Sequence, residues 1–225
     1  MQDTIVISIG GSVFLKGSDY IRAIGSMLDT LSKNYRFAVT VGGGRIAREY
    51  INMGRELGGD ETTLDELGIA VTRLNARLLV LALPSAYPLI PETVEDAYRC
   101  FRQGGIVVMG GTTPGHTTDA VAAMLAEKMR AKKLINVTNV DGLYDKDPRK
   151  YSDAKKIERC TFDELLKMLS QSEYTAGQSH IFDLLGAKIL KRAGIKLIIV
   201  SGENIDLLKD VITDKEPGGR WTEIE

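Results

Sequence analysis

The sequence predicts an α/β fold in which helices cover both faces of a mainly parallel sheet, a three-layer helix–sheet–helix sandwich. Two observations predict it. Segments with the apolar spacing of helices alternate with short β-branched runs, and such alternation indicates parallel strands joined by right-handed crossovers. The runs are too short for helices and are typical of buried strands; they cover residues 5–9, 37–41, 106–109, 134–138 and 197–200.

The helical segments have recognisable starts and stops. Apolar residues recur at helical spacing from Ile21 to Leu31 and, in the longest segment, from Leu64 to Leu81. Thr161 and Glu164 form a capping box, and Gly194 ends a helix over residues 183–192. A glycine pair at 218–219 predicts a hairpin turn into a terminal edge strand, so we expect a mixed sheet.

Length and composition narrow the class of protein. The 225 residues suit a single α/β domain covering positions 1–225. A formal charge of −1 gives no basic excess, so we expect neither nucleic acid nor a membrane surface as the main partner. Cys100 and Cys160 lie outside any CxxC or Cys/His cluster, and we expect them to be reduced. Without a basic-flanked leader or a long apolar run, the chain is expected in the cytoplasm.

The first two predicted strands end in glycine-rich turns. Gly10 and Gly11 follow the first strand, and the three glycines at 42–44 follow the second, where a helix begins with Arg45 and Arg48. Glycines let backbone amides approach an anion, and a helix N-terminus attracts negative charge. The triple glycine predicts a phosphate site, whereas the Gly10–Gly11 pair alone is equally consistent with a plain turn.

A third turn carries the most informative motif. Residues 110–119, here called the threonine loop, read Gly-Gly-Thr-Thr-Pro-Gly-His-Thr-Thr-Asp between a strand and a helix. Four hydroxyls, several amides and a helix N-terminus suit an oxyanion, and Asp119 could orient a lysine or reach a magnesium ion. His116 stands where a Walker A motif needs lysine, which argues against a Walker-type NTPase.

A fourth motif follows the strand at 134–138. Asn139 and Asp141 lead into a turn at Gly142, and Tyr144 offers an aromatic surface to a purine. Taken alone, this segment is also consistent with a surface turn that packs a tyrosine.

In this order the four motifs resemble those of the amino acid kinase superfamily, and the similarity is greatest to its archaeal type of UMP kinase. The resemblance extends over essentially the whole chain. Its most specific segments are the threonine loop and Thr-Asn-Val-Asp-Gly-Leu-Tyr at 138–144.

The resemblance implies an acceptor site for UMP in the N-terminal part of the chain and an ATP site in the C-terminal part. The implied ATP ligands are Gly10, Gly11, Gly44, Arg48, Thr138, Asn139, Tyr144 and Asp147. The implied UMP ligands are Gly43, Asp65, Thr113, Pro114, Gly115, His116, Thr117, Thr118 and Asp119. The implied catalytic residues are Lys188, Asp119 and Asp141.

One position departs from the superfamily pattern. Many members carry a lysine two residues before the first glycine pair, and here that residue is Ser8. By resemblance, Lys188 supplies the charge at the transferred phosphoryl group, and Lys16 is a second choice. From the sequence alone, a lysine on a helix is also consistent with a solvated surface charge that has no catalytic role.

The implied reaction is ATP + UMP → ADP + UDP, by direct in-line transfer on the route to CTP. Similar enzymes use magnesium and form hexamers built from dimers. Two alternatives stay open: a kinase of another phosphorylated acceptor such as isopentenyl phosphate, and a non-catalytic nucleotide-binding storage or regulatory protein. Two roles stay open as well. Asp119 could simply cap a helix, and Asp65 could close a capping box with Thr62, beside a second possible box of Thr63 and Glu66.

Overall fold

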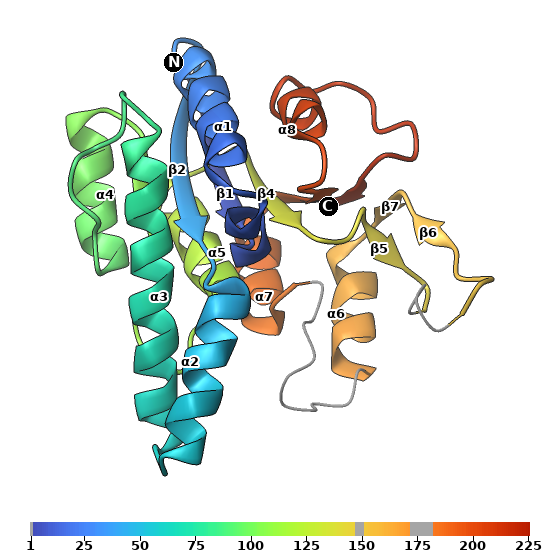
Figure 1. Cartoon of the computed structure of the whole chain (residues 1–225). Helices are drawn as coiled ribbons and strands as arrows, with labels where there is room; N and C mark the ends of the chain where they lie inside the picture. The colour runs from blue at the N-terminus through green and yellow to red at the C-terminus, as the bar shows by residue number, and fades with distance from the viewer. Residues whose placement is uncertain (1, 147–150, 172–181) are drawn as a thin grey trace.

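The computed structural model describes residues 2–146, 151–171 and 182–225. Within them, a seven-stranded sheet has the order β3-β2-β1-β4-β8-β9-β7 (Figure 1). The strands β3 to β8 in this order pair in parallel, which confirms the predicted parallel core. The five predicted strands appear as β1 (Asp3–Ile9), β2 (Tyr35–Val41), β3 (Val107–Met109), β4 (Lys133–Thr138) and β8 (Lys196–Ser201).

The sheet is mixed, as predicted, but the terminal strand is not at its edge. β9 (Thr222–Ile224) pairs antiparallel with β8 and parallel with β7 (Arg159–Cys160), so it lies between them. The edge-strand prediction is therefore wrong. Its cause is that β7 has only two residues, one charged and one apolar, and such a segment carries no strand signal in the sequence.

Helices cover both faces of the sheet and make three layers. Alternate residues of β1 point to opposite faces, because side chains alternate along a strand. Ile5, Ile7 and Ile9 face α1 (Ser18–Leu31), α3 (Glu61–Leu81) and α8 (Ile205–Ile212), whereas Val6 faces the opposite cluster. That second cluster is formed with α4 (Val94–Gln103), α5 (Thr118–Met129), α6 (Phe162–Gln171) and α7 (Leu184–Ala193).

The other elements lie between these layers and the site. η1 (Gly11–Lys16) follows β1, α2 (Gly44–Glu56) follows β2, and β5 (Leu143–Tyr144) forms a small antiparallel hairpin with β6 (Lys156–Ile157). α2 packs along α3, and both extend past the carboxyl edge of the parallel strands (Figure 1). Among the helices of the described residues, none is both long and apolar enough to cross a membrane.

The predicted helix signals at 161 and 194 are confirmed. The amide and hydroxyl of Thr161 both donate to Glu164, and the Glu164 amide donates back to the Thr161 hydroxyl. Gly194 ends α7 with a φ of 63°, in the left-handed region that favours glycine. Asp183 caps the same helix by accepting a hydrogen bond from the Gly186 amide at 2.7 Å.

Candidate active site

The glycine turns after β1 and β2 meet at the carboxyl edge of the sheet, where open α/β sheets bind their ligands. The Gly10 amide donates to the carbonyl of Val137 on β4 at 2.8 Å, and the Gly42 amide donates to the carbonyl of Ile9 at 2.9 Å. The turn after β1 is therefore held between the ends of β2 and β4. Gly10, Gly43, Gly44 and Thr138, all predicted nucleotide ligands, lie along this one edge.

Two of these glycines are required by the protein itself. A Cβ added to Gly11 would lie 2.1 Å from the Gly44 nitrogen, and one added to Gly44, whose φ is +63°, would lie 2.5 Å from the Gly11 carbonyl carbon. No side chain fits in either place. Close approach of the two turns thus explains Gly11 and Gly44 without a ligand, and it brings the two predicted phosphate-binding turns into contact.

Side chains of the helix α3 form hydrogen bonds with these turns and with the threonine loop, and the sequence did not identify them. The buried side chain of Asn75 donates to the carbonyl of Gly42 at 2.9 Å. Buried Thr72 accepts a hydrogen bond from the Gly111 amide at 2.7 Å and donates to the carbonyl of Ile69. Both are polar residues on the otherwise apolar buried face of α3, which is the one sequence signal that could have identified them.

Arg73 continues this contact between α3 and the threonine loop. Its guanidinium donates to the carbonyls of Gly111 at 3.3 Å and Thr112 at 3.4 Å, and it forms an ion pair with Glu92 at 2.8 Å. Gly110 is needed here as well, since a Cβ would lie 2.4 Å from the Thr72 hydroxyl oxygen. The loop is therefore anchored at its start by two consecutive residues of α3.

Asp65 anchors the middle of the same loop. Its carboxylate accepts a hydrogen bond from the Gly115 amide at 2.7 Å, across 50 residues of sequence. The capping boxes considered at Thr62 and Thr63 are wrong, because Asp60 is the N-cap of α3 and accepts from the Thr63 amide at 2.9 Å. Asp65 is thus brought to the predicted acceptor site rather than to the helix end.

Asp119 lies in the first turn of α5 and is not its cap. Thr117 caps that helix by accepting a hydrogen bond from the Ala120 amide at 3.1 Å, so the capping alternative for Asp119 is wrong. Ser8 donates to the Asp119 carboxylate at 2.7 Å. Burial raises the pKa of Asp119 to about 6; the negative charge of Asp183 also raises it, while the hydrogen bond from Ser8 opposes the rise.

The two predicted lysines, Lys188 and Lys16, differ in the contacts that their side chains make. Lys188 is an exposed residue of α7 and forms no ion pair within the described parts of the chain. The first turn of α7 packs close to Asp119, since a Cβ on Gly186 would lie 3.3 Å from the Asp119 carbonyl. Lys16 forms an ion pair with Glu203 at 2.9 Å and lies 4.8 Å from the centre of the Tyr20 ring.

The segment after β4 forms a charged hairpin. The Tyr144 hydroxyl donates to Asp141 at 3.0 Å, and the ammonium of Lys156 lies 3.0 Å from the same carboxylate. Burial acts to raise the pKa of Asp141, but the hydrogen bonds from Lys156 and Tyr144 outweigh it and hold that pKa below its usual value. The sequence did not identify Lys156, which comes from the facing strand β6.

The remaining predicted ligands lie on the surface of this edge or beyond what the structure describes. Arg48 and His116 are exposed, and Arg45 forms an ion pair with Glu49 at 3.3 Å. Asn139 is exposed, and the Thr138 hydroxyl donates to its side-chain oxygen at 3.4 Å. Asp147 lies outside the described residues. The other exposed or half-exposed ligands of the threonine loop are Thr113, Pro114, Thr117 and Thr118.

At this edge, glycine turns follow consecutive parallel strands, and a loop rich in hydroxyls precedes a helix. The sequence model of the amino acid kinase family matches residues 3–201. The chain therefore belongs to the amino acid kinase family.

Several proteins named uridylate kinase are similar to this chain over most of its length. The chain is 43% identical over 217 residues to a uridylate kinase of Methanobrevibacter smithii, covering 95% of this chain and 96% of that one. It is 47% identical over 203 residues to a uridylate kinase of Methanothermobacter thermautotrophicus, covering 89% and 91%. The crystal structure of uridylate kinase from Archaeoglobus fulgidus superposes with a TM-score of 0.89, at 40% identity and with both chains fully covered.

The raised pKa of Asp119 predicts a pH-dependent gain in stability for Asp119→Asn. The folded chain holds this proton more tightly than the unfolded chain, whose aspartate titrates near 3.8. The carboxyl's contribution to the free energy of unfolding is therefore complete below that value and is lost as the pH rises through about 6. Since asparagine does not ionise, the variant should unfold at a higher temperature than wild type at pH 8, and most of this gain should vanish at a pH of about 4.

Calorimetric unfolding of both proteins at the two pH values checks this result. Asp19→Asn, in the first turn of α1 and exposed, is the matched control and should give no gain at pH 8. An Asp119→Asn protein that is less stable than wild type at pH 8 would show that the ionised carboxylate is favourable in the fold.

Proposed function

We propose that the chain transfers the terminal phosphoryl group of ATP to UMP, giving ADP and UDP. The observation that carries this proposal is the anchoring of the threonine loop to α3 beside the joined glycine turns, in a chain more than 40% identical over its length to uridylate kinases. It supports one site for two anions. The product UDP is a precursor of CTP, which assigns the enzyme to pyrimidine nucleotide synthesis.

The chemistry fits this arrangement. Phosphoryl transfer through a loose transition state needs positioning and neutralisation of charge more than covalent catalysis. The attacking oxygen of UMP is already an anion, so the transfer needs no general base. In this proposal, the threonine loop and Asp65 bind UMP, while the turns at Gly10, Gly11 and Gly44 and the hairpin of Tyr144 bind ATP.

Magnesium fits as part of the ATP substrate. The described residues contain no group of three His, Cys, Asp or Glu side chains that could hold a metal ion. Mg²⁺ keeps several waters and is commonly bound through substrate phosphates with one or two carboxylates. We therefore propose that it enters with ATP, and that Asp119 is the carboxylate nearest to the reacting groups. Removal of Mg²⁺ by a chelator should abolish turnover.

We propose further that one domain, residues 1–225, holds both sites and works in the cytoplasm, where its nucleotide substrates are made. The N-terminal part contributes Asp65 and the threonine loop, and the C-terminal part contributes Tyr144 and Lys188. Fractionation of cells that recovers the chain with membranes would contradict this location.

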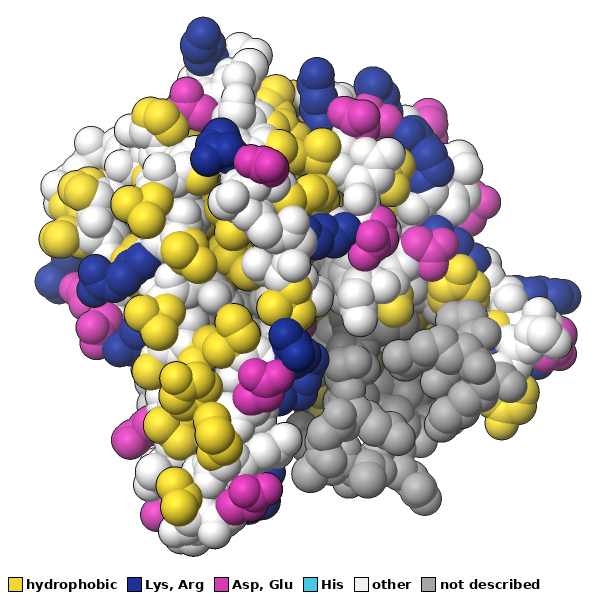
Figure 2. Space-filling view, in the orientation of Figure 1, with side chains coloured by type: hydrophobic (Ala, Val, Ile, Leu, Met, Phe, Trp, Pro, Cys, Tyr) yellow, Lys and Arg dark blue, Asp and Glu magenta, His cyan; other side chains and the backbone are white. Residues whose placement is uncertain are grey.

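We also propose that the chain self-associates, as its resemblance to hexameric kinases implies. Figure 2 shows hydrophobic side chains gathered over α2 and α3. On α3, Leu74, Leu78 and Leu81 are 61%, 47% and 84% exposed, and on α2 Leu57 is 88% exposed just past the helix end. An apolar face of this kind marks an interaction surface.

Sedimentation velocity tests the self-association. The wild-type chain should sediment as a species several times heavier than its 24.6 kDa monomer, and Leu78→Glu should shift it to smaller species. Leu89→Glu, at a leucine outside α3 that is 65% exposed, is the control and should leave the wild-type distribution unchanged. A monomeric wild-type chain would overturn the proposed assembly.

A coupled assay of ADP release with ATP, Mg²⁺ and a panel of phosphorylated acceptors tests the function itself. UMP should be turned over faster than isopentenyl phosphate, carbamate or amino acids. Turnover of isopentenyl phosphate but not UMP would assign a different acceptor to the same fold. Nucleotide binding without any turnover would instead favour a storage or regulatory protein.

Lys188 is proposed to stabilise the transferred phosphoryl group. Lys188→Met should lower kcat at least tenfold while both Michaelis constants stay within a few-fold, because the charge acts mainly in the transition state. Lys191→Met is the matched control on the same helix, since Lys191 is engaged with Asp163. Normal turnover by the Lys188 variant would leave Lys16 or an arginine to supply the charge.

Asp65 is proposed to accept hydrogen bonds from the ribose hydroxyls of UMP. Hydrogen bonds to a charged group contribute about 1.5–3 kcal/mol, so Asp65→Ala should lower kcat/KM for UMP by about 10- to 100-fold. The lost contact with Gly115 would affect UMP and deoxy-UMP equally. If Asp65 also contacts the ribose, the Asp65→Ala variant should lose part of the wild-type preference for UMP over deoxy-UMP. An unchanged ratio between the two substrates would leave Asp65 as an anchor of the loop only.

A further inference from the structure

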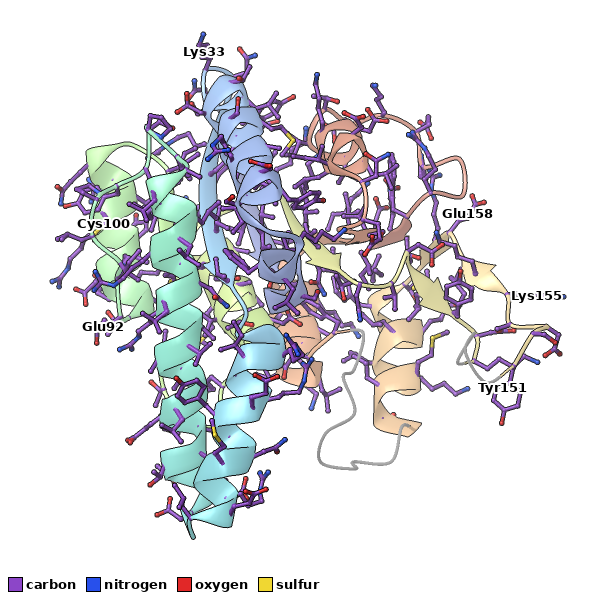
Figure 3. The ribbon with its side chains drawn as sticks, viewed as in Figure 1. Lys33, Glu92, Cys100, Tyr151, Lys155 and Glu158 are labelled. Carbon is purple, nitrogen blue, oxygen red and sulfur yellow. The ribbon has the colours of Figure 1, made fainter. Side chains whose placement is uncertain are left out.

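Arg73 donates hydrogen bonds to backbone carbonyls, although it lies next to the proposed anion site. Two of its nitrogens donate to the carbonyls of Gly111 and Thr112, and a third lies 2.8 Å from Glu92. Glu92 is labelled in Figure 3, where it lies beside α3. Three of its N–H groups are thus engaged and its charge is paired with Glu92, so Arg73 holds the start of the threonine loop.

The two carbonyls fix the direction of two amides. A trans peptide is planar, and its N–H points opposite to its C=O. The described residues contain no cis peptide bond. When Arg73 binds the carbonyls of Gly111 and Thr112, the amides of Thr112 and Thr113 therefore point away from α3. Neither amide donates to another group in the described ranges of the chain.

We infer that Arg73 is a positioning residue that orients the amides of Thr112 and Thr113 toward the acceptor phosphate. This inference rests on the proposed function, because it assigns the phosphate of UMP to the threonine loop. Two amides held in one direction form an anion-binding concavity without any reorganisation when the ligand arrives. Thr72 reinforces the same geometry by binding the Gly111 amide on the side of α3.

The alternative is that Arg73 acts by its positive charge alone. Its side chain is 26% exposed, and its partner Glu92 is 68% exposed, so the charge of Arg73 is already offset by a carboxylate that lies in solvent. A charge effect would be preserved by lysine, whereas the orientation of two carbonyls would not. A lysine has a single ammonium group and lacks the planar fork that reaches the two carbonyls and Glu92 together.

Binding of UMP and of uridine to the purified full-length protein tests the inference. The ratio of their dissociation constants measures what the phosphate contributes to affinity. Arg73→Gln should reduce this ratio by about tenfold, through weaker binding of UMP, while binding of uridine and of ATP changes by less than about twofold. Calorimetric titration gives all three constants, and a thermal unfolding scan confirms that the variant is folded.

Two further variants separate the possible causes. Arg73→Lys should behave like Arg73→Gln, and a ratio that stays at the wild-type value in the lysine variant would overturn the inference in favour of a charge effect. Arg99→Gln, at an ion-paired arginine of α4 that binds Glu95 and Asp96 and no described backbone carbonyl, is the matched control and should leave the ratio unchanged.

The outcomes also separate this inference from the proposed function. If wild type binds UMP much more tightly than uridine and Arg73→Gln does so equally well, the function stands and the role of Arg73 is overturned. If wild type binds UMP no better than uridine, the threonine loop does not bind the acceptor phosphate, and both proposals fall.

Discussion

The contact between the turns at Gly11 and Gly44 is the constraint on which the rest of this edge depends. The two backbones approach so closely that neither position has room for a Cβ. Because the turns touch, η1 and α2 begin beside each other at the carboxyl edge of the sheet. The requirement is imposed by packing and would hold in the absence of any nucleotide. A glycine motif that suggests only ligand binding in the sequence therefore has a structural cause as well.

The helix α3 also determines the geometry of the site, through hydrogen bonds made by its polar side chains. Asn75 holds the turn after β2, while Thr72, Arg73 and Asp65 hold the threonine loop at its start and middle. These residues bring together segments that are up to 50 positions apart. One rigid helix thus sets the distance between the turn and the loop. Ala76 and Leu79, apolar residues of the same buried face, pack in the core, so the core and the site share the same element.

Much of the fold was predictable because its signals are local. The five strand runs, the capping box at Thr161 and the stop at Gly194 each depend on a few adjacent residues. What escaped prediction depends on partners that are distant in sequence. The sequence did not identify Asp60 as the cap of α3, because Thr62, Thr63 and Asp65 lie nearby and could also close the helix start. Only the backbone geometry selects among them. The same holds for Lys156, whose pairing with Asp141 exists only once β5 and β6 form a hairpin.

The place of β9 in the sheet has a consequence for how the chain is assembled during synthesis. Within the part of the chain that the structure describes, β7, at residues 159 and 160, pairs in the sheet only with β9, at residues 222–224. More than sixty residues are thus translated after β7 before its partner exists. The chain is made from its N-terminus, so the parallel strands β1 to β4 have their partners early. β7 has no pairing partner until β9 has been made. This edge of the sheet therefore closes only after β9 has been made and has paired between two segments made earlier.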